Sequence, residues 1–260
     1  MKAQRFVPPF SLEGKRALVT GASRGIGAAT ARLLAAAGAR VFIHYRNDAQ
    51  GAAALVEAIC ASGGAAVATH CELTNEAEVA RMFDRIEAQG GVVDILVNNA
   101  GIFSDSPLFE LTAPMWRSMF NANMDSVHNV TRRAAQAMKG AGGGAVVNIA
   151  SIAAHSPQPD MAHYSSAKAA LLMFTRASAQ ALGPHRIRVN SVSPGLVMRD
   201  GLEESWPEGV KSWRARAPLG RVVSPDAIAQ ACLFLASPAA NFITGQDIAV
   251  DAGMTCAALY

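Results

Sequence analysis

The sequence lacks long apolar runs and any marked excess of charge, and these absences exclude several classes of protein. No apolar stretch approaches the length needed to span a bilayer, so a membrane-spanning protein is not expected. The net charge of +3 is small and unclustered, which disfavours a nucleic-acid or anionic-membrane surface. Residues 1–10 have neither a continuous apolar core nor a small-residue cleavage site. They therefore predict a loose N-terminal arm instead of a signal peptide.

Cysteine is also scarce, and its placement argues against metal or disulfide chemistry. The four cysteines, Cys60, Cys71, Cys232 and Cys256, are scattered without metal-ligand spacing. We therefore expect reduced thiols in a cytoplasmic protein and no metal site. With 260 residues, 51% of them hydrophobic, the chain is long enough to bury one large core. These features predict a single domain over residues 1–260.

Apolar strand-like segments alternate with helix-like segments along the chain. The predicted strands are Arg16–Thr20, Arg40–Tyr45, Ala65–His70, Val93–Val97, Ala145–Ala150, Arg188–Val192 and Asp247–Val250. The predicted helices are Ile26–Ala37, Ala49–Ala61, Glu76–Gln89, Met115–Lys139, Met161–Leu182 and Pro225–Ala236. This alternation predicts an α/β fold of the Rossmann-like, doubly wound type, in which helices cover both faces of a parallel sheet of seven strands.

A glycine-rich turn follows the first predicted strand and precedes a predicted helix. Gly21, Gly25 and Gly27 let the backbone turn tightly and approach a pyrophosphate, whose negative charge the helix N-terminus favours. Their spacing departs from the Gly-x-Gly-x-x-Gly of the commonest dinucleotide folds, but the strand-to-helix context is the required one. We interpret the turn as a dinucleotide site; an ordinary turn between strand and helix is the alternative.

Tyr164, Lys168 and Ser151 have the residue types and spacing for proton transfer at a carbonyl oxygen. Tyr164 and Lys168 are four positions apart, hence on one face of the predicted helix. An ammonium one turn away favours the phenolate, which predicts a lowered phenol pKa, while Ser151 holds the substrate oxygen. The pair alone is typical of a solvated helix face. It gains weight because the glycine turn predicts a site for a hydride donor.

The end of the second predicted strand indicates which dinucleotide is bound. Tyr45 occupies the place where an NAD site puts a carboxylate for the ribose 2′-hydroxyl. Arg24 and Arg46 could together hold a 2′-phosphate through forked, charge-assisted hydrogen bonds. We therefore expect NADP(H), although Asp48 is near enough to leave NAD(H) open.

Several motifs occur together in the order found in the short-chain dehydrogenases/reductases. They are Thr20-Gly21-x-x-x-Gly25-x-Gly27, Asn98-Asn99-Ala100-Gly101, Asn123, Ser151, Tyr164-x-x-x-Lys168 and Pro194-Gly195. From about residue 14 to 254 the chain resembles this family, and within it the 3-oxoacyl-(acyl carrier protein) reductase-like branch. That branch gathers many enzymes with other substrates.

The resemblance implies roles for individual residues. Ser151, Tyr164, Lys168 and Asn123 would be catalytic, with Asn123 holding a water that links Lys168 to solvent. The implied cofactor-binding residues are Gly21, Ser23, Arg24, Gly25, Ile26, Gly27, Arg46, Glu72, Leu73, Asn99, Ala100, Gly101, Tyr164, Lys168, Pro194, Gly195 and Val197. Glu72 stands where the family usually has Asp, and Arg199 where it often has Thr.

The stretch 199–220 lies between the predicted sixth strand and the last predicted helix. Its sequence reads as irregular, and long loops in compact domains are often lids. We expect it to close over the substrate, with Trp206 or Trp213 as apolar cover. A subunit interface is an equal alternative for both tryptophans.

These observations lead to one expected function and two alternatives. We expect NADPH-dependent reduction of a ketone or 3-oxoacyl-type carbonyl to a secondary alcohol, with Tyr164 as general acid. The alternatives are an NAD(P)-dependent alcohol or sugar dehydrogenase working oxidatively, and a non-catalytic NADP-binding regulator. The expected partners are a small carbonyl or alcohol substrate, with a carrier-bound acyl group as one option, and further copies of the chain in a homotetramer.

Overall fold

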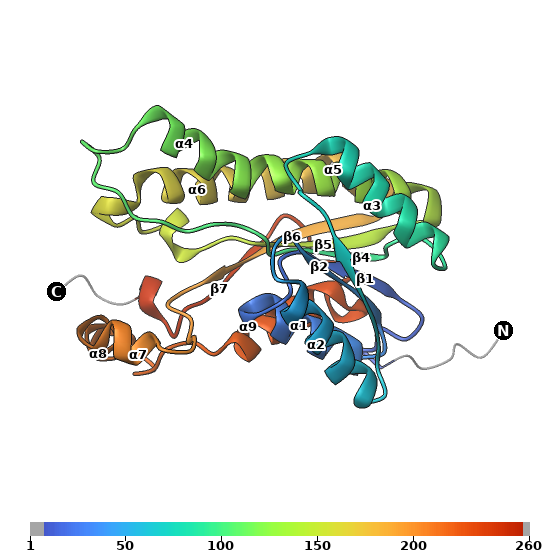
Figure 1. Ribbon diagram of the computed structural model, residues 1–260, viewed down its shortest axis with the longest axis horizontal. Helices are drawn as coiled ribbons and strands as arrows, with labels where there is room; N and C mark the ends of the chain where they lie inside the picture. Colours follow the sequence, from blue (N-terminus) through green and yellow to red (C-terminus); the bar gives the residue numbers. More distant parts are fainter. Residues whose placement is uncertain (1–7, 257–260) are drawn as a thin grey trace.

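Seven parallel strands form one sheet in the order β3-β2-β1-β4-β5-β6-β7, as a computed structural model of the chain shows for residues 8–256 (Figure 1). The strands are β1 (Arg16–Val19), β2 (Arg40–Tyr45), β3 (Ala65–His70), β4 (Ile95–Asn98), β5 (Gly144–Ile149), β6 (Ile187–Pro194) and β7 (Asp247–Val250). The predicted doubly wound α/β fold is confirmed, and three predicted strands have the observed bounds without change.

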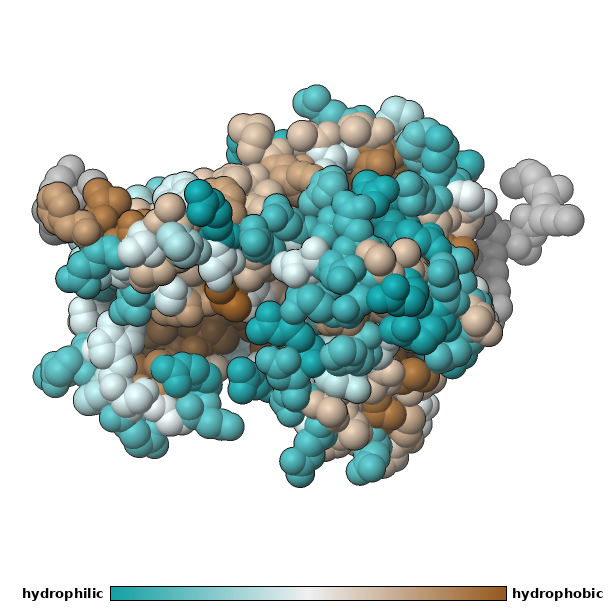
Figure 2. All heavy atoms as spheres, turned by 45° about the horizontal axis from the view of Figure 1, so that its top comes forward, coloured by the Kyte–Doolittle hydropathy of each residue, from teal (hydrophilic) through white to brown (hydrophobic). Residues whose placement is uncertain are grey.

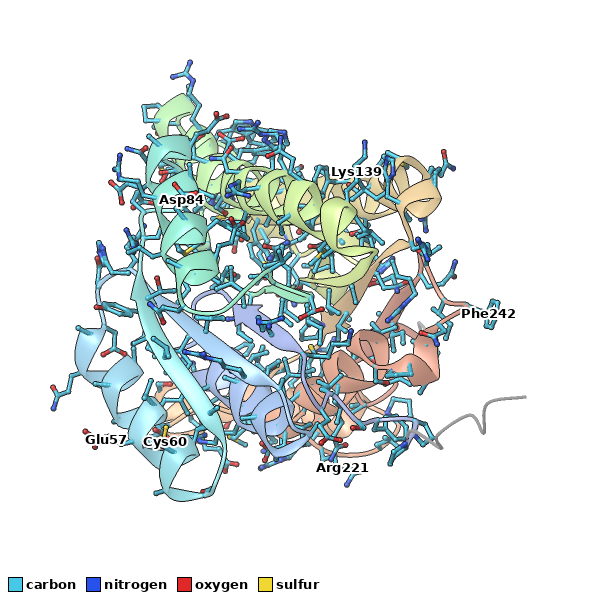
Figure 3. All side chains as sticks on the ribbon, turned by 90° about the vertical axis from the view of Figure 1, so that its right-hand side faces the viewer. Glu57, Cys60, Asp84, Lys139, Arg221 and Phe242 are labelled. Atoms are coloured by element: carbon cyan, nitrogen blue, oxygen red, sulfur yellow. The ribbon has the colours of Figure 1, made fainter. Side chains whose placement is uncertain are left out.

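Helices cover both faces of the sheet (Figure 1). One layer holds α1 (Gly25–Ala36), α2 (Ala49–Ala61) and α9 (Pro225–Ala236). The other holds α3 (Glu76–Ala88), α4 (Ala113–Phe120), α5 (Ser126–Ala141) and α6 (Ala162–Leu182). Figure 3 shows the two layers from the side, with Glu57 and Cys60 on α2 in one layer and Asp84 on α3 in the other.

The strands are apolar along their whole length because each face of the sheet packs on a different helical layer. Leu18 packs into the core beneath α3 and α5, whereas its neighbours Ala17 and Val19 pack into the core beneath α1, α2 and α9. Phe42 and Ile43 divide in the same way. Successive side chains of a strand point to opposite faces, so a sheet that is buried on both faces needs apolar residues at nearly every position.

The order of the strands places a crevice at one end of the sheet. The strand β1 pairs with β2 on one side and with β4 on the other, in both cases parallel. The chain therefore winds away from β1 in opposite directions. In such sheets the crevice beyond the carboxyl ends of the strands at this switch point is where ligands bind.

The long helix predicted over Met115–Lys139 is interrupted. A π-helical turn, Asn121–Asp125, separates α4 from α5. Two side chains bond across its ends: the Ser126 hydroxyl donates to the Ala122 carbonyl at 2.7 Å, and the Asn123 side-chain amide donates to the Met119 carbonyl at 3.0 Å. A π turn adds a residue to the helical repeat and is frequent at functional sites.

The stretch 199–220 is not irregular, so that part of the prediction is wrong. It contains two short helices, α7 (Leu202–Ser205) and α8 (Pro207–Arg216). Pro207 occupies the first turn of α8, where a missing N–H costs nothing and the fixed φ suits a helix. Side chains from both helices are buried, and these contacts fold the segment locally.

The chain ends are described only in part. Residues 1–7 of the predicted arm, and 257–260, lie outside the described residues. Pro8, Pro9 and Phe10 are exposed, but the Pro9 carbonyl accepts a hydrogen bond from Ala239 at 3.0 Å. Among residues 8–256, no helix combines the length and the apolar character that crossing a bilayer requires.

Candidate active site

The glycine turn after β1 is shaped by close contacts and by an uncapped helix. A Cβ on Gly27 would stand 2.5 Å from the Gly21 carbonyl oxygen and 2.6 Å from Asn99 Nδ2, so only glycine fits there. Gly21 and Gly25 have positive φ, 60° and 57°. Arg24 is the N-cap residue of α1, and no side chain caps the first turn of this helix. Its free N–H groups suit a pyrophosphate.

The loop after β4 fastens the glycine turn to the sheet. Asn99 Nδ2 donates to the carbonyls of Thr20 and Gly21, both at 2.9 Å. The backbone N–H groups of Asn99 and Ala100 donate to Thr20 Oγ1, also at 2.9 Å. Ala100 in turn lies 2.9 Å from where a Cβ of Gly21 would stand. The two loops that flank the switch point are therefore one rigid unit.

A cleft of about 380 Å³ opens at this unit. It extends over the carboxyl ends of β1, β2, β3 and β4, as the switch-point argument requires. The predicted cofactor residues that line it are Gly21, Ser23, Arg24, Ile26, Arg46, Glu72, Leu73, Asn99, Ala100 and Gly101. Gly25, Gly27, Pro194, Gly195, Val197, Ser151, Tyr164 and Lys168 do not line it. The cleft has the place and the lining expected of an adenosine and pyrophosphate site.

Charges at the outer end of the cleft compensate each other in part. Arg46 lies 3.5 Å from Glu72 in an ion pair. Burial raises the pKa of Glu72, but hydrogen bonds from Thr74 and the Arg46 guanidinium outweigh it, and the net pKa is lowered. Asp48 accepts a hydrogen bond from Gly51 at 2.9 Å, which together with one from Ser23 lowers the pKa of its carboxyl. The Arg46 guanidinium is thus already paired with the Glu72 carboxylate.

The residues predicted to transfer a proton lie beyond the neighbouring strand ends. Ser151 follows β5, and its Oγ accepts from Ala153 N–H at 3.1 Å. Tyr164 and Lys168 are on one face of α6, with Lys168 Nζ 5.7 Å from the centre of the Tyr164 ring. Lys168 is buried and donates to the Ile149 carbonyl at 2.9 Å. The structure therefore brings the three predicted residues together.

The electrostatics of Tyr164 differ from the prediction. Burial raises the pKa of the phenol, and the hydrogen bond with Ser151 opposes this rise only in part. Burial also lowers the pKa of Lys168 to about 8, which weakens its preference for the charged form. The predicted lowering of the Tyr164 pKa is therefore wrong for this arrangement. A raised pKa keeps the phenol protonated at neutral pH.

Asn123 lies in the π turn, beside Lys168. Its Nδ2 donates to the Ile102 carbonyl at 3.0 Å, in addition to Met119. Its Oδ1 is buried and accepts no hydrogen bond from the described residues. A Cβ on Gly101 would stand 2.5 Å from this Oδ1 and 3.8 Å from Lys168 Nζ. The free oxygen thus faces the region of the lysine, as a polar relay requires.

Asn98 acts in the core and not in the cleft. Its Nδ2 donates to Thr131 Oγ1 at 2.9 Å and to Asn148 Oδ1 at 2.8 Å. Asn148 Nδ2 donates in turn to Thr175 Oγ1 at 2.9 Å. This buried chain ties β4 and β5 to α5 and α6, and polar residues at these strand positions were its only sequence signal. These buried hydrogen bonds hold α6, the helix that carries Tyr164, against the sheet.

The turn after β6 is supported from below by the predicted lid. A Cβ on Gly195 would stand 2.8 Å from two ring carbons of Trp213. Trp213 is buried and donates from Nε1 to the Arg221 carbonyl at 3.2 Å. Val197 forms an isolated bridge with Val223. Trp213 is therefore an anchor for α8 beneath Gly195, and neither of its two predicted roles describes this contact.

A hollow with a hydrophobic floor lies on the side of the molecule that carries α7 and α8 (Figure 2). Phe103, which is exposed, packs edge-on against Tyr164 with ring centres 5.0 Å apart. Trp206 on the lid segment is also exposed. An apolar substrate group could thus lie beside the phenol.

Among the described residues, no group of His, Cys, Asp and Glu is placed to hold a metal ion.

His44 is a residue of the cleft that sequence reasoning missed. It is buried at the carboxyl end of β2 and lines the cleft. Its Nδ1 accepts from Gly21 N–H, and its Nε2 is 3.0 Å from the Cys71 carbonyl. A polar residue inside an otherwise apolar strand was the available signal.

Known proteins match this sequence across nearly the whole chain. The family model described as enoyl-(acyl carrier protein) reductase matches residues 21–255. The 3-oxoacyl-(acyl carrier protein) reductase of Synechocystis sp. is 37% identical over 245 residues, covering 94% of this chain and 98% of the relative. The cis-4-hydroxycyclohexanecarboxylate dehydrogenase of Sinomonas cyclohexanicum is 41% identical over 241 residues, covering 92% and 96%.

The fold is also similar to that of solved structures. A gluconate 5-dehydrogenase from Burkholderia cenocepacia, solved in complex with NADP and tartrate, superimposes with a TM-score of 0.90 at 35% identity. The match covers 96% of this chain and 98% of that one. All these relatives act on a hydroxyl or carbonyl group according to their names, yet on different molecules.

Proposed function

Because the chain belongs to the short-chain dehydrogenase/reductase family, we propose that it reduces a ketone or 3-oxoacyl-type carbonyl to a secondary alcohol with NADPH. It is an NAD(P)-dependent oxidoreductase of CH–OH and C=O groups. The observation that carries the finer proposal is the hydrogen-bonded pair of the Tyr164 phenol and the Ser151 hydroxyl beside the exposed ring of Phe103.

The chain's residues fit the dinucleotide. The uncapped start of α1 and the crowding at Gly27 form a cradle that a side chain would fill. The pyrophosphate would lie on this helix N-terminus, with the adenosine towards Glu72 and Leu73 and the nicotinamide near Gly195. Lys168 would hold the nicotinamide ribose. When bound, the reduced nicotinamide supplies the hydride.

The residues around the carbonyl then supply orientation and a proton. Ser151 donates a hydrogen bond to the carbonyl oxygen, and Tyr164 donates its phenolic proton to the same oxygen as negative charge develops there. A neutral phenol is the proton donor that reduction needs, and the raised pKa of Tyr164 keeps the phenol in that form. Lys168 beneath the ring, together with the free Oδ1 of Asn123, would return a proton to the phenolate from solvent.

Oxidation of an alcohol is the second candidate function, because two of the similar proteins are named as dehydrogenases of hydroxy acids. In that direction Tyr164 would have to act as a base. With its pKa raised, the phenolate becomes abundant only at high pH. Oxidation would therefore accelerate as pH rises, whereas reduction would be retained at neutral pH. The pH profiles of the two directions separate these candidates.

Replacement of Tyr164 by Phe tests the mechanism. The variant keeps the ring that packs against Phe103 and loses only the proton donor. We expect turnover of simple ketones and β-ketoesters to fall by about 10²–10⁴, the usual yield of general acid–base catalysis, with NADPH binding retained. Ser166→Ala removes an exposed hydroxyl from the same helix and is the control. Undiminished turnover by the Phe variant would refute the role, and NADPH binding without turnover in the parent protein would favour a regulator.

We also propose a cytoplasmic homotetramer that accepts small or carrier-bound substrates. Support for the assembly comes from exposed apolar side chains near α4 and on α6, namely Leu108, Phe109, Met115, Trp116 and Met173. Where exposed apolar side chains form a contiguous patch, they mark an interaction surface. Sedimentation measures the assembly directly. Parallel assays with a free β-ketoester and the same acyl group on a carrier protein test the substrate.

A further inference from the structure

We propose that His44 is a positioning residue of the dinucleotide site, whose imidazole joins the glycine turn to the end of β3 and so presets the turn for the pyrophosphate. The inference rests on the proposed function, because it concerns the cofactor that this function uses. It goes further in assigning the shape of the phosphate turn to a side chain outside the glycine motif.

Two consecutive N–H groups of the turn are bound to this one residue. The Gly21 N–H donates to His44 Nδ1 at 3.0 Å, and the Ala22 N–H donates to the His44 carbonyl at 2.9 Å. On its other side, Gly21 is closely approached by Ala100. The turn is thus held between the histidine and the loop after β4. With Gly21 at a φ of 60°, a conformation that few residues adopt, these contacts define its path.

The far side of the imidazole reaches the third strand. His44 Nε2 lies 3.0 Å from the carbonyl oxygen of Cys71, which directly precedes Glu72 and Leu73 in the cleft. A carbonyl only accepts, so Nε2 carries the proton and Nδ1 is the acceptor for Gly21. The neutral ring in this single tautomer satisfies both partners. A protonated ring would present a donor to the Gly21 N–H and break that contact.

The surroundings keep the ring neutral. Burial lowers the pKa of His44 to about 4, and the hydrogen bond to Cys71 opposes this effect only in part. The charged or titratable neighbours are His70 and Arg46, which lower the pKa further, and Glu72, which raises it. The imidazole is therefore a fixed acceptor for the glycine turn throughout the physiological range of pH.

Two isosteric substitutions separate the two contacts. In His44→Asn the side-chain oxygen can take the place of Nδ1, so the acceptor for Gly21 is kept and the donor to Cys71 is lost. In His44→Gln the side-chain nitrogen can take the place of Nε2, so the donor is kept and the acceptor is lost. Each variant removes one hydrogen bond, so the two variants should lose a similar amount of stability. His70→Gln removes a neighbouring, exposed imidazole and is the control.

The experiment measures NADPH dissociation constants of the full-length variants by fluorescence, together with kcat and KM for NADPH. We expect Gln to weaken NADPH on the order of 10-fold, equivalent to about 1.4 kcal/mol, chiefly through KM. Asn should stay within about 3-fold of the parent protein, or about 0.6 kcal/mol, as should His70→Gln. Imidazole ¹⁵N shifts of the parent protein should show an unprotonated Nδ1 at pH 7.

Three results would overturn the inference. They are parent-like NADPH binding by the Gln variant, equal weakening in the Asn and Gln variants, and a protonated Nδ1 at pH 7. A parent protein that binds neither NADPH nor NADH would instead overturn the proposed function, so the two failures are distinguishable. Thermal unfolding of both variants checks that each is folded during the measurement.

Discussion

Gly27 gives a sharp test of the way in which the dinucleotide turn is built. A Cβ at this position would stand 2.5 Å from the Gly21 carbonyl oxygen, 2.6 Å from Asn99 Nδ2 and 2.8 Å from Ala22 Cα, whereas ordinary contacts begin at 3.4 Å. Two of these neighbours are backbone, and Asn99 is held by its own hydrogen bonds to Thr20 and Gly21. None of the three can move aside without cost.

The expected cost of Gly27→Ala has two parts. Overpacking of a well-packed site costs about 1–3 kcal/mol. Displacing the Asn99 amide weakens two hydrogen bonds, each worth about 0.5–1.5 kcal/mol. The sum is about 2–6 kcal/mol, which for a domain of this size corresponds to a fall in Tm of roughly 4–24 °C. NADPH binding should weaken in parallel, because the same shift moves the turn that receives the pyrophosphate.

Two other glycines serve as controls for the same substitution. Gly25 has nothing within 4 Å of its Cβ position but a φ of 57°, so Gly25→Ala should cost only the conformational strain, about 1–2 kcal/mol. Gly140, exposed on α5, has open space and no positive φ. Gly140→Ala should stabilise by about 0.4–1 kcal/mol. Thermal melts and NADPH titrations of all three variants measure the series. A Gly27→Ala protein with the Tm and the NADPH affinity of its parent would refute the reasoning.

Three further predictions concern the Arg46–Glu72 ion pair, the pH dependence of stability and the two tryptophans of the segment 199–220. Glu72→Gln frees Arg46 from an exposed ion pair worth about 0.2–1 kcal/mol. The ratio of kcat/KM for NADPH to kcat/KM for NADH should therefore rise by up to about 5-fold, and an unchanged or lower ratio would contradict this. His44 has its folded pKa lowered from 6.5 to about 4, so the stability it contributes as a neutral ring is complete above about pH 6.5 and is lost as the pH falls towards 4. Urea unfolding at pH 7 and pH 4.5 should show an acid loss of up to about 3 kcal/mol that His44→Gln lacks, and equal losses would exclude the effect. Trp213→Ala should lower the free energy of unfolding by about 3–5 kcal/mol, whereas replacing the exposed Trp206 by Ala should change it by no more than about 0.5 kcal/mol. Equal melting temperatures of the two variants would show that Trp213 is no anchor.

The sequence was most informative where one local pattern determines one local structure. The existence of all seven strands and of most helices followed from hydrophobic periodicity, because burial on both faces of the sheet leaves a continuous apolar run in each strand. The bounds were predicted without change for only three strands. Ser151, Tyr164 and Lys168 were predicted to transfer a proton because that chemistry demands specific residue types at short spacing, and the structure brings the three together. The raised pKa of Tyr164 was not predictable, since it results from burial by residues distant in sequence.

Other parts of the site depend on long-range contacts that no spacing reveals. The Arg46–Glu72 ion pair joins the ends of two strands, and His44 binds Gly21 and Cys71 across the sheet edge. The helices α7 and α8 in the predicted lid are short, and α8 is anchored by the packing of Trp213 against Gly195.

By itself, the sequence determined the alternation of the seven strands with most of their helices, the glycine turn and the identities of the residues proposed to transfer a proton. Each of these depends on residues that are close together in the chain, where steric and hydrogen-bonding preferences act directly. The tertiary structure alone decided which side chains form ion pairs, which are buried and which tautomer His44 adopts. These properties depend on desolvation and on partners from other strands, so they arise only when the sheet has brought its edges together.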